Sequence, residues 1–417
     1  MVGDHFEYLE VIENLKVESI DPSTGSGICR NVNETIRVPA VIEGEVVSAR
    51  VYRKKDGVVD ADLVEIHEAA PFRVKPSCEF FETCSGCQFQ HIEVEKQRDI
   101  KRNFVIQALR KYSNLSDIHV SQTLGGDKVF GYRSKLTPRF DLPRRRRHNI
   151  VPSIGIRERG RFRIVDISKC LIASNGINDE LLKLREEVHE KIRAGEFSRG
   201  AQLLLRDDGT GKITTDQRAI METKIGGITF EYLAHDFFQV NHEVTEILVR
   251  EVLNRCESEN IDFVADMYSG CGMFAVHIAA WKSQRHVVGV EVSKKAVECA
   301  RRNAKRAGLQ NISFECGHSE SIFESLVEKS QFNSDRTCVV IDPPRNGCDE
   351  SFLSQLLRFG PQKIVYVSCN PETLSRDLAS LFPYYRVDGE IQPLDMFPQT
   401  RHVECVVSLM NRATNNY

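Results

Sequence analysis

The feature that most limits the fold of this chain is a regular alternation of short apolar runs and amphipathic segments over residues 226–417. The short runs suit buried strands, and the segments between them carry the apolar spacing of helices. Parallel strands need such crossover helices, whereas antiparallel strands can be joined by tight turns. The pattern therefore predicts an α/β fold with a doubly wound parallel sheet. The runs are Phe263–Met267, Val287–Val290, Ile312–Glu315, Cys338–Ile341 and Ile364–Val367, and Cys405–Leu409 is expected to add an edge strand.

The rest of the chain predicts two further domains, because 417 residues exceed what one ordinary core supports. Residues 1–70 contain short strand candidates separated by Gly turns, which is typical of a small β-barrel. Residues 71–225 mix short strands with helical patterns over Ile92–Lys111 and Ile177–Ile192. We therefore expect a β-barrel over 1–70, a mixed α+β middle domain over 71–225 and the α/β domain over 226–417.

A glycine-containing loop follows the first strand of the α/β domain. Gly270 and Gly272 lie between this strand and a helical pattern, where glycine lets the backbone approach a ligand. Glu291 closes the next strand about 20 positions later, where an acidic side chain suits ribose hydroxyls. Because the third glycine of the dinucleotide fingerprint is absent, we expect a nucleoside cofactor rather than NAD.

Several reactive side chains stand at or just beyond the ends of predicted strands. They are Asp266, Glu291, Asp342 and Cys369. The carboxyl ends of parallel strands form the ligand crevice of an open α/β sheet, so these groups are expected to share one site. Glu404 instead precedes the last strand, and it reaches the same edge only if that strand is antiparallel. A buried inert thiol and a surface carboxylate are the simpler interpretations of Cys369 and Glu404.

Three cysteines lie close together in the segment CEFFETCSGCQFQ, and a fourth follows far downstream in DISKCLIA. They are Cys78, Cys84, Cys87 and Cys170. This grouping suits a tetrahedral zinc site or a four-iron, four-sulfur cluster, and the number of thiolates does not separate the two. The spacing of radical S-adenosylmethionine enzymes is absent, so we expect a structural or RNA-positioning role.

Residues 133–163 form a basic stretch in a chain whose formal net charge is −3. Eleven Lys or Arg stand against two acidic residues, with Phe140, His148 and Phe162 between them. A local basic patch with aromatic side chains suits single-stranded RNA, although a charge run is usually only a solvated face. The basic residues are Arg133, Lys135, Arg139, Arg144, Arg145, Arg146, Arg147, Arg157, Arg159, Arg161 and Arg163.

Four motifs resemble those of the RNA 5-methyluridine methyltransferase family and occur in that family's order. They are FFQVN at Phe237–Asn241, DPPRNG from Asp342, SCNPETLSRDL from Ser368 and DMFPQTRHVE at Asp395–Glu404. The resemblance implies a Rossmann-like, S-adenosylmethionine-dependent methyltransferase domain, with Cys369 as the nucleophile and Glu404 as the base. The implied contacts to S-adenosylmethionine are Gln239, Tyr268, Glu291 and Asp342. Met273 departs from the family, whose members often carry a polar residue there.

The chemistry of uracil agrees with this pair of residue types. Uracil C5 is a poor nucleophile, so a thiolate must first add to C6 and raise the electron density at C5. The C5 proton must then leave before the thiol is eliminated, which requires a base. A thiol and a carboxylate in one pocket meet both needs.

The resemblance extends more softly to the N-terminal half. The strand pattern of residues 1–70 resembles the TRAM domain, an OB-like RNA-binding barrel. Iron–sulfur members of the family have three grouped cysteines followed by a late fourth one, which implies a 4Fe–4S cluster rather than zinc. We therefore expect a structured RNA substrate whose target base is flipped out, with ribosomal RNA favoured over transfer RNA.

Two other functions stay open on the sequence. Turns like Asp342-Pro343-Pro344 also serve the methylation of exocyclic amines, which would need neither Cys369 nor Glu404. A non-catalytic RNA-binding protein would keep the basic stretch but would have no reason to keep the thiol, the carboxylate and the cofactor loop. Apolar runs of about 18 residues and a signal-peptide pattern are not found, so we expect a cytoplasmic monomer that does not enter membranes.

Overall fold

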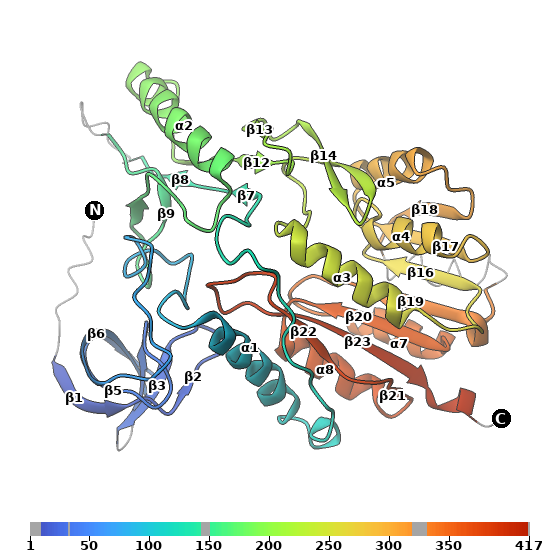
Figure 1. Ribbon diagram of the computed structural model, residues 1–417, viewed down its shortest axis with the longest axis horizontal. Helices are drawn as coiled ribbons and strands as arrows, with labels where there is room; N and C mark the ends of the chain where they lie inside the picture. Colours follow the sequence, from blue (N-terminus) through green and yellow to red (C-terminus); the bar gives the residue numbers. More distant parts are fainter. Residues whose placement is uncertain (1–9, 32–33, 143–150, 319–331, 416–417) are drawn as a thin grey trace.

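The computed structural model describes residues 10–31, 34–142, 151–318 and 332–415. The chain runs from a β-rich N-terminal part, through a mixed middle part, to a large sheet flanked by helices (Figure 1, from blue to red). Within these ranges no helix has the length and apolar character needed to cross a bilayer.

The N-terminal part is a six-stranded sheet around its own apolar core, here called the N-terminal sheet. Its order is β1-β5-β6-β4-β3-β2, with β4 and β6 parallel and the other neighbours antiparallel. That the sheet is a TRAM or OB-type barrel over residues 1–70 stays a prediction, and residues 1–9 lie outside the described ranges. The strands are β1 (Val11–Lys16), β2 (Ser19–Ile20), β3 (Gly27–Asn31), β4 (Glu34–Val38), β5 (Val46–Lys55) and β6 (Val58–Glu68).

The middle part contains both predicted helices, α1 (Val94–Leu109) and α2 (Asn175–Ala194). α2 begins where the Ser174 side chain accepts the N–H of Ile177, and it ends at Gly195 in the left-handed conformation. Two small sheets, β10-β9-β8-β11 and β13-β12-β7, precede the hairpin β14–β15. The strands are β7 (Lys135–Leu136), β8 (Arg139–Phe140), β9 (Gly155–Arg157), β10 (Ile164–Asp166), β11 (Ala201–Gln202), β12 (Leu205–Asp207), β13 (Ile213–Thr214), β14 (Ile220–Ile225) and β15 (Ile228–Leu233).

The large sheet confirms the predicted α/β fold. Its order is β18-β17-β16-β19-β20-β23-β21, with β22 pairing on β23. The strands from β18 to β20 are parallel, and β23 is antiparallel to β20. The strand order reverses between β16 and β19, and open α/β sheets bind ligands in the crevice at such a switch point. The strands are β16 (Phe263–Met267), β17 (His286–Glu291), β18 (Ile312–Cys316), β19 (Thr337–Ile341), β20 (Lys363–Ser368), β21 (Tyr385–Val387), β22 (Gln392–Leu394) and β23 (Glu404–Asn411).

Helices cover both faces of the large sheet (Figure 1). One face packs against α3, α4 and α5, with Leu248 and Val297 in the shared core. The other face packs against α7 and α8, with Phe352 buried between them and the sheet. α1 joins this second layer, because Val105 and Leu109 lie in the same core. The helices are α3 (His242–Arg255), α4 (Met273–Trp281), α5 (Lys294–Arg306), α7 (Glu350–Phe359) and α8 (Pro371–Leu381).

α1 also holds the loop that leads into β23. Lys101 and Asp395 form an ion pair with both side chains fully buried, and Lys101 donates to the carbonyl oxygen of Phe397 over 3.0 Å. The Gln97 amide donates to the side-chain oxygen of Gln399 over 3.0 Å, and the Gln399 backbone N–H donates back over 2.9 Å. Gln399 stands at φ +70°, where a non-glycine residue is strained. These contacts therefore fix a turn that would otherwise relax.

Replacing Lys101 by Met is expected to lower the free energy of unfolding by about 3–5 kcal/mol, because the buried Asp395 would keep only the more distant Arg98, whose Nε lies 3.9 Å from its Oδ2. Urea denaturation of both proteins measures the loss. Lys111→Met is the matched control, since the Lys111–Glu372 ion pair is exposed by 59% and 44% and should contribute about 1 kcal/mol or less. Equal losses in the two variants would contradict the anchoring role of the buried pair.

Candidate active site

The candidate site lies at the carboxyl edge of the large sheet. Asp342 follows β19 and Cys369 follows β20, as predicted. β23 runs antiparallel to β20 with Ser368 opposite Cys405, so Glu404, the first residue of β23, starts beside Cys369. Glu404 was expected to reach this edge only if the last strand is antiparallel, and β23 is antiparallel. A thiol and two carboxyl groups meet at one place.

Glu291 shapes the glycine loop that follows β16. It ends β17, where its carboxylate accepts the backbone N–H of Gly270 at 2.9 Å and that of Ser293 at 2.8 Å. Gly272 has φ +85°, and a Cβ atom there would lie 2.9 Å from the ring of Phe314, so glycine is required. The loop therefore places an acidic side chain beside the N-terminus of α4.

Asp266 has a structural part in the same loop. It is fully buried, and its Oδ2 accepts the Ser269 hydroxyl at 2.7 Å and the Ala275 N–H at 3.0 Å. Burial raises its pKa to about 7, and the neighbouring Glu291 adds to the shift. Asp266 thus closes the loop onto α4, whereas the sequence pattern grouped it with the side chains expected to face a ligand.

The two other predicted cofactor contacts lie on different elements. Tyr268 directly follows β16 with φ +65°, and its ring packs edge-on against Phe352, with the centroids 5.7 Å apart. Gln239 is 4% exposed and precedes α3, whose N-terminus is capped by the Asn241 side chain accepting the Val244 N–H. Their roles as contacts to a cofactor stay predictions.

Cys369 is presented by a turn from strand to helix. Asn370 caps α8 by accepting the N–H of Glu372 at 3.2 Å, and Pro371 occupies the first helical turn. The Asn370 side-chain amide also donates to the carbonyl oxygen of Arg345 over 3.1 Å. The thiol is therefore fixed at the start of a helix by the turn that follows β19.

The electrostatics of the site disfavour the ionised forms of its thiol and of two of its carboxyl groups. Burial raises the pKa of the Cys369 thiol to about 12, with further increases from Glu404 and Asp342, while Arg345 lowers it. Burial, together with Asp342, raises the pKa of Glu404 well above its usual range, again against Arg345. Burial and Asp266 raise the pKa of Asp342 to about 7.

Arg345 is the functional residue that the sequence prediction missed. Its backbone carbonyl ties the turn after β19 to α8, because it also accepts the Thr373 hydroxyl at 3.3 Å. Its side chain is the cation that favours the ionised forms of Cys369 and Glu404. The motif DPPRNG contained this residue, and the need to balance two carboxyl groups and a thiol was the signal that could have singled it out.

Replacing Arg345 by Gln is expected to raise the pKa of Cys369, because the variant lacks the cation that stabilises the thiolate. Less thiolate is then present at any pH below that pKa, so alkylation of Cys369 by iodoacetamide at pH about 9 should slow about tenfold. Mass spectrometry of the Cys369 peptide measures the rate, and the exposed Cys316 in the same sample is the internal control. Equal rates in both proteins would contradict the role given to Arg345.

Two neighbouring cavities lie at this site, and Cys369 lines one of them. The first, the Cys369 cavity, has a volume of about 540 Å³ and is also lined by Asp21–Ser23, in the turn between β2 and β3. The second, the four-cysteine cavity, has a volume of about 440 Å³ and reaches Gln239. Arg345 and His402 line both, so the two cavities are neighbours.

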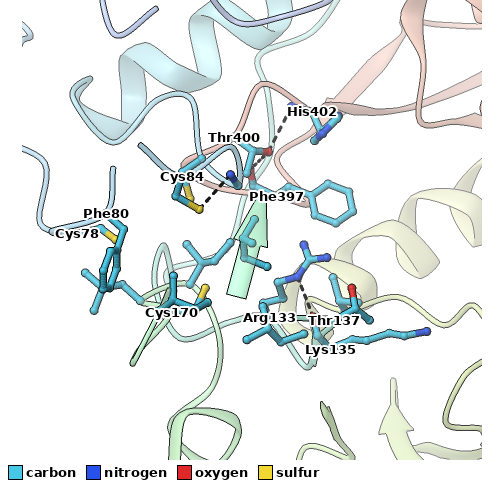
Figure 2. A pocket seen from close by; sticks show the side chains of 18 of the residues that line it. Cys78, Phe80, Cys84, Arg133, Lys135, Thr137, Cys170, Phe397, Thr400 and His402 are labelled. Carbon is cyan, nitrogen blue, oxygen red and sulfur yellow. Dashed lines mark hydrogen bonds between the residues drawn. The ribbon is translucent and has the colours of Figure 1, made fainter. Parts of the chain in front are cut away.

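All the predicted metal ligands line the four-cysteine cavity (Figure 2). Burial raises the pKa of each thiol, that of Cys84 to about 11 and that of Cys87 to about 12. Within the described ranges no three His, Cys, Asp or Glu side chains are grouped closely enough to hold a metal ion. The structure thus brings Cys78, Cys84, Cys87 and Cys170 around one space, and a bound metal stays a prediction.

The predicted RNA-contact stretch divides into parts with different surroundings. Arg144–Arg147 and His148 lie outside the described residues. Phe140 is 1% exposed and packs edge-on against Phe197, so its predicted role as a stacking surface is wrong. Phe162 is 78% exposed, with the Arg157 guanidinium 5.8 Å from its ring centre. Of the two aromatic rings that the structure describes in this stretch, only that of Phe162 is exposed.

Comparison with known families identifies this arrangement. The model of the family described as tRNA (Uracil-5-)-methyltransferase matches residues 165–412, more than half of the chain. The chain belongs to this family. It is therefore an RNA uracil-C5 methyltransferase that uses S-adenosylmethionine, and the reading as a non-catalytic RNA-binding protein is set aside.

Individual relatives extend the match over almost the whole enzyme. The tRNA (uracil(54)-C(5))-methyltransferase of Schizosaccharomyces pombe is 36% identical over 97% of this chain and 79% of the relative. That of Saccharomyces cerevisiae is 28% identical over 96% of this chain and 74% of the relative. The crystal structure of Pyrococcus abyssi tRNA (uracil-54, C5)-methyltransferase with S-adenosyl-L-homocysteine superposes with a TM-score of 0.73 at 25% identity, covering 98% of this chain and all of that one.

Proposed function

We propose that the enzyme methylates uracil C5 through a covalent adduct between Cys369 and C6 of the base. The observation that carries this proposal is the pairing of β20 with the antiparallel β23, which starts Glu404 beside the thiol at the ligand edge of the sheet. A nucleophile and a base in one pocket are what C5 chemistry needs. Methylation of an exocyclic amine would require neither the thiol of Cys369 nor the carboxylate of Glu404.

In the proposed reaction the Cys369 thiolate forms a C–S bond to C6, and the electron pair of the C5–C6 double bond moves into an enolate. C5 then bonds to the methyl group, and S-adenosylhomocysteine is released. Glu404 takes the C5 proton and later passes it to water. The electrons of the C–H bond restore the C5–C6 double bond as the C–S bond breaks, which returns the thiolate. Arg345 favours the thiolate of Cys369, which attacks C6, and the carboxylate of Glu404, which takes the C5 proton.

We propose that Gln239, Tyr268, Glu291 and Asp342 contact S-adenosylmethionine. The Glu291 carboxylate accepts two backbone N–H groups and keeps further lone pairs for ribose hydroxyls. Asp342 stands between the glycine loop and Cys369 in the strand order, where the methyl donor and the base would meet. Support also comes from the S-adenosyl-L-homocysteine held by the similar Pyrococcus structure.

The proposed substrate is transfer RNA, and the proposed nucleotide is uridine 54. The names of the two yeast relatives and of the Pyrococcus structure support this choice. It replaces the preference for ribosomal RNA that the cysteine pattern favoured. The exposed Phe162, beside Arg157 on the hairpin of β9 and β10, offers a base a stacking surface with a positive charge nearby. We propose that the N-terminal sheet, as a TRAM-like domain, binds the same RNA.

We further propose that the four-cysteine cavity holds a 4Fe–4S cluster. A single zinc ion would need four sulfur atoms at about 2.3 Å from one point, whereas a cluster is bound by thiolates spaced around a larger body. The support for the cluster is that four thiols line one cavity, as a body bound through four cysteines requires. The cluster would tie Cys170 to the segment of Cys78–Cys87 and so brace the middle part.

Metal analysis of protein purified without oxygen tests this assignment. We expect about four iron atoms and four sulfides per chain. Cys87→Ala should lose most of both and of the visible absorbance, whereas Cys316→Ala, which changes an exposed thiol far from this cavity, should keep them. One zinc per chain with no sulfide would contradict the cluster.

A methyl-transfer assay with labelled S-adenosylmethionine tests the activity. Unmodified transfer RNA and ribosomal RNA are offered separately, and the labelled nucleoside is identified after digestion. We expect 5-methyluridine at position 54 of transfer RNA, as the relatives' names indicate. Label found only in ribosomal RNA would overturn the substrate, and label in a methylated exocyclic amine would overturn the mechanism.

A further inference from the structure

A third cavity, here called the flank cavity, lies between the N-terminal sheet and the middle part and has a volume of about 400 Å³. That volume is in the range of small-ligand pockets. Its lining combines one aromatic ring with arginines and small polar side chains. The residues used below are Tyr52, Arg53, Asp60, Ser85, Gln88 and Arg159.

The flank cavity and the Cys369 cavity share Ser23 and Arg401. Arg401 belongs to the loop before β23, and its Nη1 donates to the carbonyl oxygen of Pro22 over 2.8 Å. Its backbone N–H donates to the Gln88 side chain over 3.3 Å. A Cβ atom on Gly25, at φ +74°, would lie 2.9 Å from Gln88 and 3.3 Å from the Arg401 side chain. The turn around Ser23, the segment of Gln88 and the loop of Arg401 therefore pack tightly between the two cavities. They form a partition that carries the guanidinium of Arg401.

No carboxylate of the described residues forms an ion pair with the Arg401 guanidinium on this partition. Arg53 in the flank cavity is paired with Asp60 over 2.5 Å, and Arg159 donates to backbone carbonyls. Arg401 forms no ion pair within the described ranges. Burial lowers the pKa of Arg401, and the neighbouring Arg345 lowers it further. Asp21 acts in the opposite direction and raises the pKa of Arg401, but its carboxylate accepts hydrogen bonds from its own turn and forms no ion pair with Arg401 within the described ranges. Two neighbouring cations beside a cavity suit a phosphate.

We infer that the flank cavity is a subsite for a nucleotide next to the target uridine in the RNA strand, and that Arg401 binds the phosphate between the two. This inference rests on the proposed function, because it takes the uridine to occupy the Cys369 cavity. A strand that crosses from one cavity to the other must pass Ser23 and Arg401. In the flank cavity the ring of Tyr52 offers a stacking surface, and the hydroxyl of Ser85 offers a hydrogen bond to a base edge. The Gln88 amide instead donates to the carbonyl oxygen of Ser85 and accepts the N–H of Arg401.

The phosphate contact is tested by fluorescence anisotropy with an unmodified transfer-RNA transcript over a series of salt concentrations. Arg401→Gln is expected to weaken binding about tenfold and to reduce the slope of log affinity against log salt by about 0.7–0.9. Arg250→Gln is the matched control, because Arg250 is an exposed arginine on α3 that lines none of the three cavities. An unchanged slope for Arg401→Gln would overturn the phosphate assignment.

The base subsite is tested with two transcripts, each with a single abasic nucleotide. In one transcript it lies on the 5′ side of uridine 54, and in the other on the 3′ side. Wild-type enzyme should bind one of them about fivefold or more weakly than the parent transcript. Tyr52→Ala should lose this discrimination, and so should Ser85→Trp, whose larger side chain occupies the cavity from outside the N-terminal sheet. Equal binding of all three transcripts by the wild type would overturn the subsite.

Formation of 5-methyluridine is followed on the same parent transcript, which separates the two proposals. A wild-type enzyme that makes 5-methyluridine but shows neither the salt effect nor the abasic effect refutes the subsite alone. A wild-type enzyme that makes no 5-methyluridine on this RNA refutes the proposed substrate, whatever the binding data show.

Discussion

Cys369→Ala is expected to lower the rate of uracil methylation about 10⁴-fold or more. Cys369 is the one thiol among the residues that line its cavity, so no neighbour can replace the nucleophile. Without addition to C6, uracil C5 is too electron-poor to take the methyl group, and loss of a nucleophile typically removes most of the catalysis. Single-turnover transfer from labelled S-adenosylmethionine to transfer RNA measures the rate.

Cys316→Ala is the control for this result, because Cys316 is an exposed thiol that does not line the Cys369 cavity. It stands opposite Glu291 in the sheet, so its rate is measured with saturating S-adenosylmethionine and should then equal that of the wild type. RNA containing 5-fluorouridine gives a second readout, since fluorine in place of the C5 proton blocks the last step and leaves the protein bound to RNA. That adduct should form with the wild type and not with Cys369→Ala. Activity of Cys369→Ala within tenfold of wild type would refute covalent catalysis.

Glu404→Gln is expected to slow turnover about 10²–10⁴-fold while allowing the first bond to form. The amide cannot take the C5 proton, so the methylated base stays attached to Cys369. The loss of the carboxylate also removes a charge that raises the pKa of the thiol, so attack on C6 should not be impaired. A protein–RNA band in a denaturing gel, formed with unmodified RNA and S-adenosylmethionine, reports the trapped adduct.

Two further variants make the Glu404 experiment decisive. Glu315→Gln changes an exposed carboxylate on β18 and should show neither slow turnover nor a trapped band. The double variant Cys369→Ala, Glu404→Gln should show no band, because it lacks the attacking thiol. Slow turnover of Glu404→Gln without any adduct would mean that Glu404 acts before the C–S bond forms, and another base would have to be sought.

The carboxyl edge of the large sheet could be predicted from the sequence, because the end of an apolar run marks the end of a buried strand. Asp342 and Cys369 each follow an apolar run, and parallel pairing then brings them together. Glu404 depended on one further fact, the direction of β23, which short apolar runs do not reveal. The residues were therefore predictable as a group before their geometry was known.

Other features depend on burial or on distant contacts, which local pattern does not report. Phe140 and Phe162 stand in the same basic stretch, yet one is in the core and the other is exposed. Asp266 lies near the end of its strand, as its neighbours do, but its Oδ2 closes a loop. Arg345 gains its importance from the Cys369 thiol and the buried Glu404 carboxyl group, which lie at the ends of other strands. No periodicity marks such differences.

The amide pair of Gln97 and Gln399 also sets the order in which the enzyme matures during synthesis. The two residues are 302 positions apart, so α1 leaves the ribosome long before its partner loop has been made. N-terminal segments generally fold first, and contacts between distant residues form late. The turn before Glu404 can therefore become rigid only after Gln399 has been made and has met α1. A nascent chain already carries the thiol of Cys369 before that point, but it does not yet have a positioned base.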